Sequence, residues 1–194
     1  GPAHRVYNDE FEHMDIARQL ASSGSFSTTL VGGLDGWDVR ARPTWPGGHH
    51  VALAAAFKLF GSSARTAFVW SALLSSLSAL FVFWAALELF DDERGALAAS
   101  FAWTVLPLAA SYGRATDLTS SSLFWIAAAL AALHAREKEP GLNAFAAVTL
   151  AYAVQIRPEN SLLLGYAVLL RAPWTVVLPA LASGTRALLG RIGV

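Results

Sequence analysis

The sequence contains no cysteine, which excludes disulfides as well as metal sites and nucleophiles built on thiolates. Charged residues are scarce, at 14% of the chain against the roughly 25% typical of soluble domains. The formal net charge is zero, so charge gives no reason to expect a nucleic acid as partner. What remains is 55% hydrophobic, with seven tryptophans and a mean hydropathy of +0.45. This composition predicts an integral membrane protein.

Hydrophobicity is unevenly distributed, because residues 1–63 are polar and the rest of the chain is mostly apolar. Runs of 22, 19 and 18 residues lack Asp, Glu, Lys and Arg, and two shorter runs follow. About 20 helical residues cross a hydrocarbon core of about 30 Å, so the pattern predicts an all-α polytopic protein with about five spans. We assign 64–185 to this transmembrane domain and leave the tail, 186–194, unclassified. The predicted spans are Arg65–Leu87, Gly95–Tyr112 with a kink at Pro107, Leu118–Leu133, Leu142–Ile156 and a last one within 160–170.

Residues 1–63 contain two predicted helices. One runs from Asn8 to Ser23 and stops at Gly24, and the other covers His49–Phe60 and stops at Gly61. The second is too short to span a bilayer, so we place it at the interface or as a re-entrant segment. The first is predicted to be amphipathic and to lie along the membrane surface. Its apolar face comprises Phe11, Met14, Ala17, Leu20 and Ala21, with Glu12, Asp15, Arg18 and Gln19 largely elsewhere.

Asp9 and Glu10 fall in the first turn of the first predicted helix, ahead of every apolar segment. Acids at this position complement the helix macrodipole, so a structural role is a good alternative to a chemical one. Asp117 directly precedes the third predicted span and could serve as its N-cap. The pair His49-His50 has neither the spacing nor the partners of a metal site, and we predict no metal site there.

Three arginines also allow two interpretations. Arg114 and Arg157 could simply snorkel at helix ends, and Arg42 could be an ordinary loop cation. Alternate turns nevertheless place Asp117, Arg157 and the N-terminal region on the same side of the membrane. A carboxylate there could deprotonate an acceptor hydroxyl, and arginines could clamp the phosphate of a lipid-linked substrate through charge-assisted hydrogen bonds.

Four motifs, each at the edge of a hydrophobic segment, follow one another in a familiar order. They are Tyr7-Asn8-Asp9-Glu10, Arg42-Pro43-Thr44-Trp45-Pro46, Tyr112-Gly113-Arg114-Ala115-Thr116-Asp117 and Ile156-Arg157-Pro158-Glu159. Over residues 7–170 the chain resembles the GT-C superfamily of membrane glycosyltransferases, which includes protein O-mannosyltransferases and enzymes that add aminoarabinose to lipid A. It departs from the pattern where the usual pair of prolines before the second surface helix is interrupted by two residues.

The resemblance implies that residues 3–63 form most of the first extracytoplasmic loop, with its two surface helices. It overrides a crude count of Lys and Arg, which would place this region in the cytoplasm. By resemblance Asp9 matches the proposed catalytic base and Glu10 is its companion, while the cations bind the lipid phosphate. The positions carried over are Asp9, Glu10 and Asp117 as catalytic acids, and Arg42, Arg114 and Arg157 as substrate-binding residues.

The resemblance also predicts the function. A sugar would move from a polyprenyl-phosphate donor to a lipid, glycan or protein acceptor outside the cytoplasm, with inversion at the anomeric carbon. Membrane lipid is the other expected partner, and nucleic acid is not. No cofactor is assigned, because family members differ in their need for a divalent metal and the acids alone do not decide it. The Ala-rich composition, with Arg favoured over Lys, suggests a prokaryotic inner or plasma membrane.

Two other functions compete with this one. The first helix and the C-terminal half of the family pattern are missing from the sequence, so we expect an N-terminal fragment of a longer enzyme. Such truncation favours a non-catalytic membrane module that binds polyprenyl lipid or scaffolds a complex. A secondary transporter is disfavoured, because the acids stay at segment ends and no internal repeat appears.

Overall fold

The computed structural model describes residues 8–29, 46–106, 111, 113, 115, 116, 118–135 and 139–171. The secondary-structure elements of this part of the chain are helices, which confirms the predicted all-α fold. The chain divides into two compact units, Gly1–Ser161 and Leu162–Val194. Of the predicted site residues, Asp9, Glu10 and Arg157 are among those described, and they belong to the first unit.

Helix α1 (Asn8–Ser23) packs against helix α2 (Gly48–Phe60). Both end where a glycine adopts a positive φ, 71° at Gly24 and 89° at Gly61, which a residue without a Cβ does at little steric cost. Both predicted helices are therefore confirmed, with α2 beginning one residue early. The buried cluster between them consists of Met14, Ala17, Leu53, Ala54, Phe57 and Ala67.

The buried face of α1 differs from the predicted apolar stripe. Phe11 is 52% exposed, whereas Ile16 is fully buried. Asp15, expected on the polar side, is buried as well. Its Oδ2 accepts hydrogen bonds from the Thr28 hydroxyl at 3.1 Å, the Thr29 N–H at 2.7 Å and the Thr29 hydroxyl at 3.0 Å. The prediction that Asp15 lies on the polar side was wrong because these hydrogen bonds replace the ones that the carboxylate would make to water.

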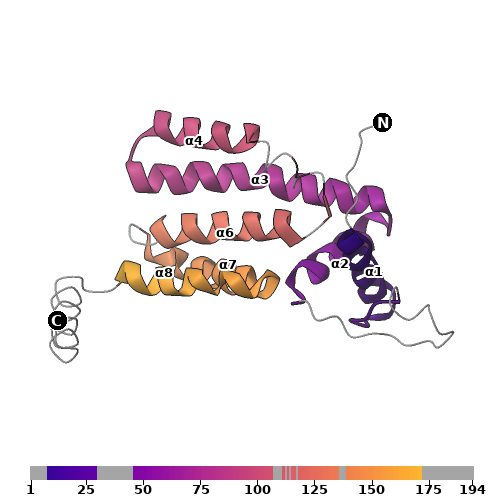
Figure 1. Cartoon of the computed structure of the whole chain (residues 1–194). Helices are drawn as coiled ribbons and strands as arrows, with labels where there is room; N and C mark the ends of the chain where they lie inside the picture. Colours follow the sequence, from indigo (N-terminus) through magenta and orange to yellow (C-terminus); the bar gives the residue numbers. More distant parts are fainter. Residues whose placement is uncertain are drawn as a thin grey trace, which may run out of the picture. The chain divides into compact units, whose positions relative to one another are not determined.

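Four helices form the layered part of the first unit: α3 (Ala64–Phe90), α4 (Glu93–Val105), α6 (Leu118–Ala135) and α7 (Asn143–Ile156). Helix α3 lies between α4 and α6, and α6 lies between α3 and α7 (Figure 1). Helix α2 contacts both α3 and α7, so it connects the α1–α2 pair to the layers. Small side chains allow α6 to approach its neighbours closely. Its buried alanines are Ala127, Ala128, Ala129, Ala131, Ala132 and Ala135.

The second predicted span is interrupted near its middle. Helix α4 ends at Val105, and Leu106 takes a ψ of 124°, outside the helical range. Leu106 precedes Pro107, and a residue before proline is pushed away from helical geometry by the proline ring. The predicted helix Gly95–Tyr112 is therefore interrupted next to its predicted kink at Pro107, and Ser111 beyond the interruption is helical. Residues 107–110 and 112 lie outside the described residues.

Within the described residues, α3 and α6 are the helices long and apolar enough to cross a membrane. Helix α7 is apolar but has 14 residues, flanked by the 3₁₀ turns η1 (Pro140–Leu142) and η2 (Pro158–Ser161). In the second unit, α8 (Leu162–Arg171) has 10 residues. The predicted count of about five spans is thus not confirmed. The tail 186–194 lies outside the described residues.

Candidate active site

Glu10 ties the first turn of α1 to a segment far along the chain. Its side chain is fully buried, and Oε1 accepts a hydrogen bond of 2.9 Å from the backbone N–H of Thr116. Thr116 is itself buried and precedes α6 by two residues. A buried N–H without a partner would be costly, so this contact holds the α1 N-terminus against the loop before α6.

Arg157 reaches the same neighbourhood from the end of α7. It follows the helix in an extended conformation, with φ −140° and ψ 125°. Its Nη2 donates a hydrogen bond of 2.9 Å to Oγ1 of Thr119, in the first turn of α6. Its Nε is buried and has no hydrogen-bond partner among the residues that the structure describes. The guanidinium is therefore held in place at one nitrogen and keeps unused donor capacity.

The turn after Arg157 is fixed by Asn160. Its Nδ2 donates to the backbone oxygen of Ala153 at 2.7 Å and to Oγ of Ser122 at 3.0 Å. Because Ala153 is in α7 and Ser122 in α6, the amide joins the two helices where Arg157 emerges. Such buried polar contacts limit the positions that the guanidinium can take.

The predicted site residues can now be placed. Asp9 lies in the first turn of α1, directly before the buried Glu10. Glu10 and Arg157 bond to Thr116 and Thr119, which are three positions apart in sequence. The structure thus brings the elements bearing Glu10 and Arg157 to the start of α6. The remaining predicted residues, Arg42, Arg114 and Asp117, lie outside the described residues.

A cluster of three histidines lies beside these contacts. His13 of α1 joins His49 and His50 of α2, with ring centroids 5.1 to 5.7 Å apart. His13 Nδ1 and His50 Nε2 are 3.0 Å apart and share a hydrogen bond. His49 Nδ1 pairs with Oγ of Ser121 in α6 at 2.7 Å. The cluster therefore connects α1, α2 and α6.

The sequence interpretation found no partners of a metal site for His49 and His50, and it did not foresee that the His13 ring packs against both. The sequence did contain one indication of this: His13 is three residues after Glu10, and residues at this spacing lie on the same face of a helix. In the part of the chain that the structure describes, no group of three His, Asp or Glu side chains is arranged to hold a metal ion.

Burial keeps His49 and His50 uncharged by lowering their pKa values. It lowers the pKa of His49 well below its usual value, helped by the neighbouring His50 and His13 and opposed by a backbone contact from Thr116. Burial and His13 together lower the pKa of His50 to about 4, against a backbone contact from Pro46. Within the described part of the chain, neither His49 Nε2 nor His50 Nδ1 has a partner with the geometry of a hydrogen bond. Both rings are therefore neutral at neutral pH.

Acidification from about pH 7 to about pH 4.5 is expected to destabilise the folded protein. An unfolded histidine titrates near 6.5, so in this range the unfolded chain binds protons that the folded chain does not. Each such histidine removes up to about 1.4 kcal/mol of stability per pH unit below about 6.5. The measurement is the thermal unfolding midpoint of detergent-solubilised protein at several pH values, with His50→Gln compared with wild type.

The variant should lose less stability on acidification, because glutamine keeps a polar side chain but does not titrate. If His50→Gln and wild type lose stability in parallel, the charge of His50 is not the cause.

Residues 46–189 match the family model described as dolichyl-phosphate-mannose-protein mannosyltransferase. The chain belongs to this family. No curated protein and no solved structure matches it. The mannosyltransferase match begins just before α2 and includes Arg114, Asp117 and Arg157, while α1 precedes it.

Family membership confirms the resemblance to GT-C membrane glycosyltransferases. Two apolar helices of spanning length fit the membrane location that such an enzyme requires. The mannosyltransferase family therefore places this protein among glycosyltransferases of the membrane.

Proposed function

We propose that the protein transfers a sugar from a polyprenyl-phosphate donor to an acceptor hydroxyl or amine outside the cytoplasm, with inversion at the anomeric carbon. The observation that carries the proposal is the match to a family described by a dolichyl-phosphate sugar. The hydrogen bond between Thr116 and Glu10 supports it. Asp9 and Asp117 are the chain neighbours of these two bonded residues, so the contact joins the regions that carry both acids.

In the proposed reaction the acceptor oxygen or nitrogen attacks the anomeric carbon as the bond to the phosphate oxygen breaks. Asp9 takes the proton that the acceptor loses, which is the role of a general base. Asp117 is the second acid at the site. Glu10 is a positioning residue, because its buried carboxylate is engaged with the Thr116 N–H.

The departing phosphate needs compensating positive charge. Arg157 is suited to this role because its guanidinium is partly buried, held by Thr119 and not fully used in hydrogen bonding. A guanidinium in a partly dry setting binds phosphate strongly through charge-assisted hydrogen bonds. Charge stabilisation that grows as the bond breaks lowers the barrier. Arg42 and Arg114 are proposed as further phosphate ligands.

Arg157→Ala in the full-length protein is expected to raise the KM for a polyprenyl-phosphate sugar donor by on the order of 10–100-fold. The reason is the loss of a hydrogen bond between charged groups, which contributes about 1.5–3 kcal/mol. Arg157→Lys should recover part of the affinity, since it keeps the charge but not the planar fork. The measurement is transfer of radiolabelled sugar at varied donor concentration in reconstituted membranes.

Arg94→Ala provides the matched control. Arg94 is an exposed cation in the first turn of α4, so its removal should leave the donor KM unchanged. Equal KM values for wild type and Arg157→Ala would remove Arg157 from the site. Donor binding without any transfer by the wild-type protein would instead identify a lipid-binding module.

A further inference from the structure

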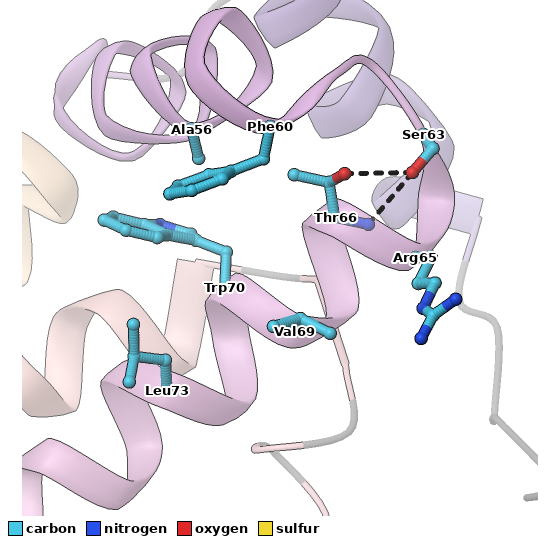
Figure 2. A pocket seen from close by; sticks show the side chains of 8 residues that line it. All are labelled: Ala56, Phe60, Ser63, Arg65, Thr66, Val69, Trp70 and Leu73. Atoms are coloured by element: carbon cyan, nitrogen blue, oxygen red, sulfur yellow. Dashed lines mark hydrogen bonds between the residues drawn. The ribbon is translucent and has the colours of Figure 1, made fainter.

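A pocket of about 470 Å³ opens at the corner where α2 ends and α3 begins. Phe60 and Trp70 lie on one side of it and Arg65 on the other, with Val69 and Leu73 following along α3 (Figure 2). The pocket lies at the opposite end of α2 from the histidine cluster: its lining residues Ala56 and Phe60 are about 9 and about 15 Å along the helix from His50, at about 1.5 Å per residue. It is therefore separate from the candidate active site.

Positive charge gathers at this corner. Arg65 lines the pocket and makes no hydrogen bond or ion pair with any other residue that the structure describes. Lys58 is exposed in the last turn of α2. Arg18 of α1 donates from Nε to Oγ of Ser62 at 3.2 Å, which brings a third cation to the same turn. The first turn of α3 contains no acid to neutralise them.

Beyond the cations, the outer face of α3 is apolar. Val69, Leu73 and Leu80 are all exposed, with Val69 at 60%, and their spacing of four and seven residues places them on one helix face. Helix α3 is one of the two candidate spans, and only 22% of its apolar window is buried within the protein. Such a helix needs lipid tails around it, so the stripe that continues from the pocket is a path for an acyl chain.

We propose that this pocket binds an anionic phospholipid of the surrounding membrane, with its phosphate at Arg65 and one acyl chain along Val69 and Leu73. Charge complementarity selects the headgroup, because basic residues at the membrane surface attract anionic lipids. The apolar wall selects a lipid rather than a free phosphate ion. Phe60, 72% exposed beside the pocket, would cover the chain where it enters.

Native mass spectrometry of the full-length protein in detergent tests this assignment, with phosphatidylglycerol and phosphatidylcholine as probes. We expect phosphatidylglycerol to be retained in preference to phosphatidylcholine. Arg65→Glu should weaken its binding by on the order of tenfold or more, because attraction of the phosphate becomes repulsion. Arg94→Glu makes the same charge reversal in the first turn of α4 and should leave binding unchanged.

A second variant separates the pocket from general surface charge. Val69→Trp fills the pocket from an exposed position and leaves all three cations, so it should also weaken binding without lowering the thermal midpoint. Equal retention of the two lipids, or unchanged binding by Arg65→Glu, would overturn the proposal. Displacement of phosphatidylglycerol by inorganic phosphate or by polyprenyl phosphate at similar concentration would also overturn it. None of these experiments measures sugar transfer, so the lipid assignment can fail or hold independently of the proposed function.

Discussion

Asp9→Asn is expected to lower sugar transfer by the full-length protein by about 10²–10⁴-fold, the usual contribution of a positioned general base. Asparagine has nearly the same shape but cannot accept the acceptor's proton. The effect on folding should be small, because an acid in the first turn of a helix contributes only about 0.3–1 kcal/mol through the macrodipole. The two measurements are the transfer rate at saturating donor and the thermal unfolding midpoint.

This pair of measurements separates the chemical role of Asp9 from the structural one. A residue that only complements the dipole of α1 would show a slightly lower midpoint and a nearly unchanged rate. Glu12→Gln is the matched control, because it removes another carboxylate from the same helix and should leave transfer intact. Near wild-type transfer by Asp9→Asn would show that the base has been assigned to the wrong residue.

The helices themselves could be predicted because their ends depend on local chemistry. Gly24 and Gly61 terminate α1 and α2 by adopting positive φ, and Asp92 caps α4 by accepting from the N–H groups of Arg94 and Gly95. Each of these signals lies within a few residues of the boundary that it sets. The end of α4 before Pro107 is equally local, and the same proline predicted the kink at this point.

The contacts at the candidate site could not be predicted in the same way, because they join residues far apart in sequence. The alternation of the predicted turns placed Glu10 and the loop before α6 on the same side of the membrane. It could not show that Glu10 accepts from the N–H of Thr116, 106 positions later. The pairing of His13 with His50 is also long-range, and burial of Asp15 depended on threonines in the following segment. Hydrophobic periodicity alone contains none of this information.

Gly48→Ala is expected to cost about 2–3 kcal/mol of folding stability, the range for overpacking a close contact. A Cβ at this position would lie 2.8 Å from the backbone oxygen of Gln155 and 2.9 Å from its carbonyl carbon. Backbone atoms cannot rotate away, so α2 and α7 would have to separate. The hydrogen bond of 2.8 Å from the Tyr152 hydroxyl to the Gly48 oxygen holds the two helices at this distance. Thermal unfolding in detergent measures the loss.

Transfer activity should fall in the same variant, because both helices that meet at Gly48 lead into the candidate site. The next two residues of α2 are His49 and His50, and Arg157 directly follows the last residue of α7. Gly47→Ala is the control: its Cβ would lie 3.6 Å from the Phe26 ring, an ordinary contact, and its backbone is helical. Equal stability of the two variants would show that α2 and α7 are not packed through this glycine. A destabilised Gly48→Ala with full transfer would show that Arg157 does not depend on its distance from the histidine cluster.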